Sequence, residues 1–164
     1  MSGIKEMSKK YNLHSWSVQG KIDPLVVTKA EGVYFWDDQD KKYFDMSSQL
    51  VNSNLGHGNK AVVEAIKAQA DKIPFIGPGY ALDVRSEAAK AIVEASGLDG
   101  AKVFFTNAGA EANENAIKLA RLYTGKLKVF SMYRCYHGAT AGAGMLTGDR
   151  KSTRLNSSHP AGSR

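Results

Sequence analysis

The chain has 164 residues, of which 43% are apolar and 23% charged, so it is long enough for one globular domain with a core. This composition excludes a disordered or fibrous protein, and a single cysteine, Cys135, excludes an internal disulfide. The four histidines and Cys135 lack the spacing of a zinc site, and no apolar run approaches the ~20 residues of a membrane span. We expect a soluble, cytoplasmic protein with no metal and no membrane partner.

The net charge of +6 raises the question of a nucleic-acid partner. Four basic residues lie in the last 15 positions, which contain no acid, so residues 1–149 carry a net charge of only +2. These four are Arg150, Lys151, Arg154 and Arg164. The nearly balanced body of the chain argues against binding to nucleic acid.

The basic C-terminal segment has no helix or strand periodicity. Residues 149–159 read DRKSTRLNSSH, and as codons all eleven match a common sequencing-library adapter. The alternative is a disordered basic terminus. We interpret residues 150–164 as a non-native tail produced by read-through, and expect Leu155 not to pack in any regular element.

Three short runs rich in Val, Tyr, Phe and Trp follow an N-terminal arm. They are Leu25–Glu31, Val33–Trp36 and Lys42–Met46. Gly32 separates the first two, and a polar segment of Asp and Gln separates the last two, as in hairpin turns. The pattern predicts a small antiparallel meander, preceded by a loose arm that carries Tyr11, His14 and Trp16. Residues 1–54 form this first region.

Two amphipathic helices are predicted next. The first begins after Asn59, a capping residue, and ends before Pro74, while Asp83 caps the second and Gly97 ends it. A Gly- and Pro-rich loop, Phe75–Tyr80, joins them. The apolar residues expected to face inward are Val62, Val63, Ile66, Ala70 and Ile73 in the first helix, and Val84, Ala88, Ala91, Ile92 and Ala95 in the second.

Residues 101–132 have the pattern strand, helix, strand. The unalternated apolar run at 103–105 is typical of a parallel strand covered on both faces, and Lys128–Met132 reads as a second strand. Between them, Ala110–Tyr123 is helical and Gly125 provides a left-handed stop. This unit predicts a right-handed crossover and an α/β fold.

The turn before that helix is a candidate anion site. Backbone N–H groups at a helix N-terminus bind phosphate, and Gly109 allows a ligand to approach the backbone of Gly109 and Ala110. The turn is neither a G-x-G-x-x-G motif nor a P-loop, so a purely structural turn is the alternative.

The sequence segments around this turn resemble those of a known family. FTNAGAEANENAIKLAR, residues 105–121, closely resembles the cofactor-phosphate loop and helix of class III aminotransferases, pyridoxal-phosphate (PLP) enzymes of fold type I. Tyr136-His137-Gly138 resembles the next signature of the family, Leu55–Gly58 the start of its large domain and Asp37–Asp45 its N-terminal meander. The resemblance implies a truncated fold-type-I protein in which residues 55–149 begin the large, mostly parallel-sheet, PLP-binding domain.

The resemblance also implies roles for four residues. Gly109 and Ala110 would donate backbone N–H groups to the PLP phosphate, and Tyr136 would stack on the pyridine ring. His137, with Gly138, would support that turn, or it is simply a packed residue. Ala108 and Ala110 flank the glycine where many relatives have Ser or Thr, so only backbone donors are expected.

The catalytic residues of the family lie in later sequence. These are the Schiff-base lysine, the acid that holds the pyridine nitrogen and a phosphate-binding threonine, and no Lys here stands in a matching motif. No catalytic residue is therefore assigned, and we expect this chain to be an inactive fragment. Glu111 and Glu114 are expected to cap their own helix, and His57 to be a hydrogen-bonding loop residue.

The implied reaction is transfer of an amino group to a 2-oxo acid. Tyr11–Trp16 and Gln49–Asn52 are most similar to members that act on taurine, β-alanine or other ω-amino acids, and the whole protein would be a homodimer. A PLP-dependent aminomutase or decarboxylase of the same fold is an alternative. A phosphate- or nucleotide-binding module is another, although Tyr133-Arg134 stands where an acidic ribose-binding residue would be expected.

Overall fold

The computed structural model describes residues 2–148, which form two compact units that divide after Tyr80. The predicted tail, residues 150–164 with Leu155, lies outside the described residues. The division after Tyr80 follows packing within this chain. The domain boundary at 54/55 inferred from the sequence concerns a whole family member and stays a prediction.

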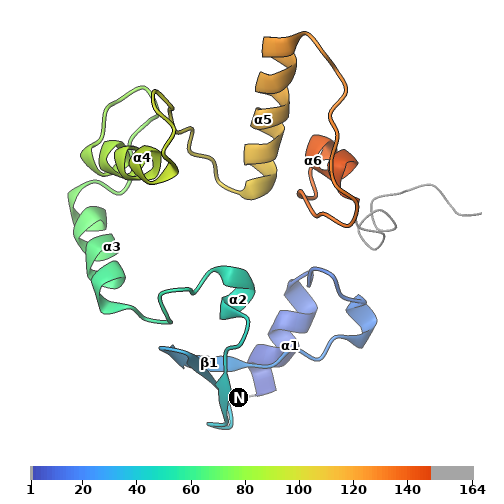
Figure 1. Ribbon diagram of the computed structural model, residues 1–164. Coiled ribbons are helices and arrows are strands. Elements are labelled where there is room, and N and C mark those ends of the chain that lie inside the picture. The colour runs from blue at the N-terminus through green and yellow to red at the C-terminus, as the bar shows by residue number, and fades with distance from the viewer. Residues whose placement is uncertain (1, 149–164) are drawn as a thin grey trace, which may run out of the picture. The chain divides into compact units, whose positions relative to one another are not determined.

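The first unit is built around the predicted meander (Figure 1). Strands β1 (Val27–Glu31), β2 (Tyr34–Asp37) and β3 (Lys42–Phe44) form an antiparallel sheet in the order β1-β2-β3, which confirms the sequence interpretation. Phe35 pairs with Ala30 on one side and with Tyr43 on the other. The Phe35 and Tyr43 rings stack with centroids 5.1 Å apart, so cross-strand aromatic packing stabilises the short sheet.

The prediction of a loose N-terminal arm is wrong. Helix α1 spans Ser2–Tyr11, and a short 3₁₀ helix, η1, spans Gln19–Lys21. The α1 segment is rich in Lys, Glu and Met, which are good helix formers, and its last-turn lysines favour the C-terminal end of the helix dipole. Lys5 Nζ lies 2.9 Å from Asp23 Oδ1, which tethers the helix to the following segment.

The predicted helices form close to their expected ends. In α3 (Lys60–Lys72), Asn59 Oδ1 accepts a hydrogen bond from Val62 N at 3.3 Å, so the expected cap is confirmed. Helix α4 (Asp83–Ser96) ends at Gly97, and α5 (Gly109–Thr124) ends at Gly125. Both glycines adopt left-handed φ angles of 67° and 68°, as the sequence predicted. Asp83 is the first residue of its helix and not the cap, which is Leu82.

The parallel strands predicted around α5 are absent among residues 2–148. Residues 103–105 and 128–132 have no strand assignment, and Phe104 and Phe130 are 70% and 91% exposed. A parallel strand is formed by ladder hydrogen bonds to neighbouring strands, and no described residue provides them here. Within the part of the chain that the structure describes, the α/β class is therefore represented by helices and one antiparallel sheet.

Few apolar side chains are buried within the described residues. The buried ones are Val26, Ile117 and Ala143. The expected inward faces of α3 and α4 are open, with Ile66 63% and Ile92 48% exposed. Their amphipathic patterns are those of helices that pack against neighbours, and no such cover is present among residues 2–148. No helix within residues 2–148 has the length and apolar character needed to cross a membrane.

Candidate functional site

The N-terminus of α5 has no side-chain cap. Ala108, at the cap position, is extended with φ −156° and ψ 161°. The first N–H groups of a helix have no intrahelical acceptor, so those of Gly109 and Ala110 depend on a partner from elsewhere. A Cβ added to Gly109 would meet no atom of the described residues within 4 Å. This helix end is open to an anion.

Glu111 fixes the turn that leads into α5. Its Oε2 accepts hydrogen bonds from the backbone N of Asn107 at 2.9 Å and from Asn107 Nδ2 at 3.1 Å. Glu111 lies in the first turn of α5, where the sequence analysis expected a capping residue, but it bonds to the segment that precedes the helix. It therefore leaves the N–H groups of Gly109 and Ala110 uncovered.

The Tyr136-His137-Gly138 turn packs against the first turn of α5. Gly138 is buried with φ +130°, and a Cβ there would lie 2.5 Å from Ala110 Cβ and 2.9 Å from Ala110 Cα. Only glycine permits this conformation and this approach. The structure therefore brings together two motifs that the sequence analysis assigned to one site.

His137 is held in place through its backbone. Asn113 Nδ2 donates to the His137 carbonyl at 2.7 Å, and His137 N donates to Thr147 Oγ1 at 3.1 Å. The Thr147 hydroxyl, itself buried, donates to the Ala143 carbonyl at 3.1 Å. The side-chain Nε2 of His137 is buried and has no hydrogen-bond partner among residues 2–148. A buried nitrogen of this kind requires a partner from outside these residues.

Tyr136 is 52% exposed, directly before this anchored histidine. Its ring is therefore accessible to a flat ligand on part of its surface. That the ring lies within a few ångströms of the Gly109 and Ala110 N–H groups stays a prediction.

Glu114 has a role that sequence reasoning missed. Its Oε1 accepts hydrogen bonds from Thr140 Oγ1 at 2.6 Å, Gly142 N at 2.6 Å and Ala143 N at 3.1 Å. These donors lie at the start of α6 (Ala141–Leu146), so the expectation that Glu114 caps its own helix is wrong. The hydrogen bond from Thr140, followed by those from Ala143 and Gly142, lowers the pKa of Glu114. Donors 26 to 29 residues away leave no local signal in the sequence.

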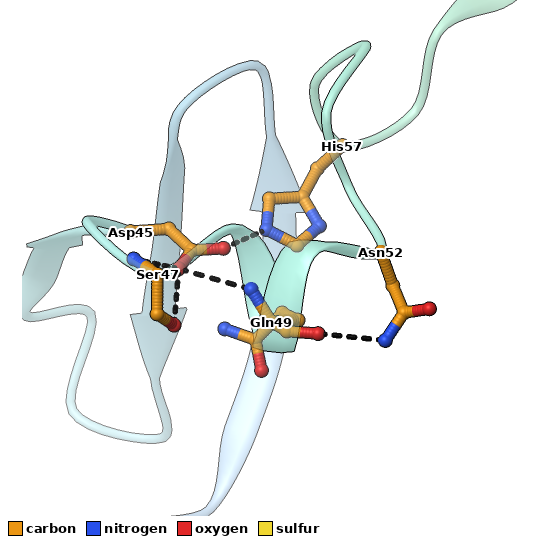
Figure 2. A network of polar contacts seen from close by, with 5 residues as sticks. All are labelled: Asp45, Ser47, Gln49, Asn52 and His57. Atoms are coloured by element: carbon orange, nitrogen blue, oxygen red, sulfur yellow. Dashed lines mark hydrogen bonds and ion pairs between the residues drawn. The ribbon is translucent and has the colours of Figure 1, made fainter. Parts of the chain in front are cut away.

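A second polar network lies in the first unit (Figure 2). His57 Nε2 lies 2.7 Å from Asp45 Oδ2, and Asp45 Oδ1 accepts from Ser47 N at 3.3 Å and Gln49 N at 3.4 Å. The His57 hydrogen bond is the largest cause that lowers the pKa of Asp45 to about 2. The backbone of His57 also pairs with Gly32 in both directions, at 2.9 and 2.8 Å. The expectation that His57 is a hydrogen-bonding loop residue is confirmed.

This network anchors a left-handed turn in α2 (Ser48–Val51). Ser48, Gln49, Leu50 and Val51 have φ angles of 47°, 49°, 58° and 67°. Left-handed backbone costs about 1–2 kcal/mol for each such residue, so the surrounding hydrogen bonds must offset it. The turn presents Leu50 and Val51 to the surface, about 70% exposed.

Comparison with known proteins identifies the family. The model of the family "Aminotransferase class-III" matches residues 16–162. The chain belongs to the class-III aminotransferase family. Acetylornithine aminotransferase from Methanopyrus kandleri is 37% identical over 139 residues, which are 85% of this chain and 35% of that protein. The Bacillus subtilis enzyme of the same name is 40% identical over 125 residues, 76% of this chain and 32% of that protein.

Solved structures of the family share the fold. Taurine:2-oxoglutarate aminotransferase from Bifidobacterium kashiwanohense, in complex with PLP and glutamate, superposes with a TM-score of 0.88 and 46% identity. The match covers 97% of this chain and 36% of that one. The omega transaminase from Pseudomonas jessenii in complex with PMP gives a TM-score of 0.86 and 30% identity, over 92% of this chain and 36% of that one. The chain thus spans about a third of the length of these relatives.

Proposed function

We propose that the whole protein to which this chain corresponds transfers an amino group from an ω-amino acid to a 2-oxo acid, with PLP as cofactor. The observation that carries the proposal is the uncapped, open N-terminus of α5 at Gly109 and Ala110, packed against the Gly138 turn, in a member of this family. The chain alone is expected to be inactive. The resemblance places the lysine that would bind PLP covalently in a part of the family's sequence that this chain does not match.

The residues at α5 fit a phosphorylated, planar cofactor. The N–H groups of Gly109 and Ala110 would donate to the phosphate at the positive end of the helix dipole. The Tyr136 ring would cover one face of the pyridine ring. His137 Nε2, which is buried and has no hydrogen-bond partner among residues 2–148, would gain one when the site is complete.

PLP, when bound, supplies an electron sink for the substrate carbon that loses its amino group. The described residues would contribute part of the binding and orienting of this cofactor. Gly109 and Ala110 would hold the phosphate end, and Tyr136 would orient the plane of the ring. No hydroxyl from the positions beside Gly109 assists, because both are alanine.

An ω-amino donor of the taurine or β-alanine type is the favoured substrate. The taurine:2-oxoglutarate enzyme is 46% identical to this chain, compared with 37% and 40% for the two acetylornithine enzymes described above. The segments 11–16 and 49–52 support the same substrate class through their resemblance to such members. The acceptor would be a 2-oxo acid.

We also propose a homodimer for the whole protein. The second unit exposes a set of large apolar side chains that a folded protein normally covers. These are Leu119 at 62%, Leu122 at 73%, Tyr123 at 94% and Leu127 at 76% exposed. The remaining two-thirds of a family member, and a second subunit, would cover them.

The test uses the full reading frame from the same locus. Gly109→Val should raise the Kd for PLP, measured by equilibrium dialysis, by about tenfold or more, because the added side chain blocks approach to the backbone. Gly3→Val is the matched control. Gly3 also lies in the first turn of a helix with open space around it, so both substitutions carry the same local backbone cost.

Amino-donor preference is measured on the same protein. Transfer to 2-oxoglutarate should be faster from taurine or β-alanine than from N-acetylornithine. A Kd for PLP that Gly109→Val leaves unchanged would remove the phosphate assignment. Faster transfer from N-acetylornithine would keep the cofactor site and reject the ω-amino substrate class.

A further inference from the structure

Glu114 connects α5 to the loop that carries Tyr136 and His137. One carboxylate oxygen, Oε1, receives all three hydrogen bonds, from the Thr140 hydroxyl and the backbone N–H groups of Gly142 and Ala143. The Thr140 side chain makes no capping bond within its own helix, so the capping of α6 is provided by Glu114. The charged form of the carboxylate is the better acceptor, and the negative charge lies at the positive end of α6.

The loop is shaped to receive this carboxylate. A Cβ on Gly142 would overlap Glu114 Oε2 and would lie 2.9 Å from Glu114 Cδ. A side chain at position 142 would therefore displace the Glu114 carboxylate from its observed position. The same loop carries Gly138, which is fitted equally closely against Ala110.

Ala110 and Glu114 are four residues apart on one helix, so they lie on the same face of α5. The contact between Ala110 and Gly138 and the hydrogen bonds of Glu114 are thus two attachment points of one loop on one rigid face. Residues between these points have little freedom to move away from the helix N-terminus. Asn113, which donates to the His137 carbonyl at 2.7 Å, adds a third attachment from the adjacent turn.

We propose that Glu114 is a positioning residue for the cofactor site: by holding the start of α6, it fixes the Tyr136–Gly138 turn beside the N–H groups of Gly109 and Ala110. The proposal rests on the proposed function for its cofactor consequence, and its structural part stands on the contacts above. Glu114 is not assigned a proton-transfer role, because its Oε1 is already occupied by three donors.

The first measurement is amide hydrogen exchange on this chain. Glu114→Gln keeps the shape of the side chain but removes its charge, so exchange at Gly142 and Ala143 should accelerate about tenfold. Thr140→Val, which removes the hydroxyl at nearly constant volume, should act in the same direction. Thr140→Ser keeps the hydroxyl and should restore protection. Glu111→Gln is the matched control on the same helix, since Glu111 bonds only to Asn107 in the contacts given above.

The second measurement is the Kd for PLP of the full-length protein. Glu114→Gln and Thr140→Val should raise it severalfold, and Thr140→Ser should leave it near the parent value. Faster exchange with an unchanged Kd would overturn the positioning role and leave Glu114 a purely structural residue. Unchanged amide exchange at Gly142 and Ala143 would contradict the attachment of the loop by Glu114.

These outcomes are separable from those of the proposed function. A Gly109→Val protein that binds PLP as tightly as the parent contradicts the phosphate assignment, whatever Glu114 does. A raised Kd in Gly109→Val together with an unchanged Kd in Glu114→Gln contradicts only the positioning role.

Discussion

Asp45 in the first unit and Glu114 in the second both gather several hydrogen bonds on a carboxylate, yet they stabilise opposite kinds of structure. Asp45 accepts from backbone N–H groups two and four residues ahead and from His57, and holds a left-handed turn. Glu114 accepts from donors more than 25 residues ahead and completes the start of a right-handed helix. In both, the pKa of the carboxyl group is lowered.

The difference shows that the structural role of a carboxylate depends on how far away in the sequence its hydrogen-bond donors lie. Local donors allow Asp45 to force a short segment into a backbone conformation that the side chains of Gln49, Leu50 and Val51 disfavour. Distant donors allow Glu114 to join two elements that each form without it. Removing Asp45 should therefore change a local conformation, whereas removing Glu114 should loosen an attachment.

The largest effect is expected where the second unit is most tightly fitted. Gly138→Ala should destabilise this unit by about 3 kcal/mol, because the new methyl group collides with Ala110 and φ +130° is unfavourable for alanine. Urea denaturation would measure the loss. Gly109→Ala is the control, because its Cβ has open space and its stability should change little. Equal effects of the two substitutions would refute the close packing at Gly138.

Acid should affect the Asp45 network over a defined range. The ordinary pKa of 3.8 falls to about 2 in the folded chain, so the stabilisation is complete above about pH 4 and is lost as the pH falls towards 2. Circular dichroism from pH 6 to 2 should show this acid-dependent loss, and Asp45→Asn should remove that component of it. An acid profile that is identical in Asp45→Asn would contradict the lowered pKa.

A smaller, stabilising effect tests the left-handed turn. Leu50→Gly should raise the stability of the first unit by about 0.5–1 kcal/mol, since glycine adopts φ 58° without the cost that leucine bears, and leucine is 70% exposed. Thermal unfolding would report the gain. Leu25→Gly is a comparison at an exposed position without a left-handed φ, and it should be destabilising. A loss of stability in Leu50→Gly would argue that the turn is right-handed.

The smallest effect is expected at the C-terminus. The hydrogen-bond partners described for both carboxylates precede residue 149, so deletion of residues 150–164 should change the unfolding free energy by less than about 0.5 kcal/mol. Comparing the melting curves of the full and shortened chains tests this. A larger loss would contradict the interpretation of these residues as a non-native tail.

The elements whose hydrogen bonds close within a few residues could be predicted from the sequence alone. Asn59 and the two helix-ending glycines, Gly97 and Gly125, could be assigned because caps and left-handed stops are local. The meander could be predicted for the same reason, since its strands are joined by short turns. The sequence of residues 105–121 resembles a motif of the family, and the match to the family model confirms that resemblance.

Three further features depend on tertiary contacts that the sequence pattern does not contain. The attachment of Glu114 to the start of α6 joins residues far apart in the chain, and no spacing rule predicts it. The strands expected at 103–105 and 128–132 find no pairing partner among residues 2–148, so these apolar segments form no strand there. The left-handed turn at Ser48–Val51 runs against the preferences of its own residues, and it exists because Asp45 and His57 supply hydrogen bonds that no local propensity contains.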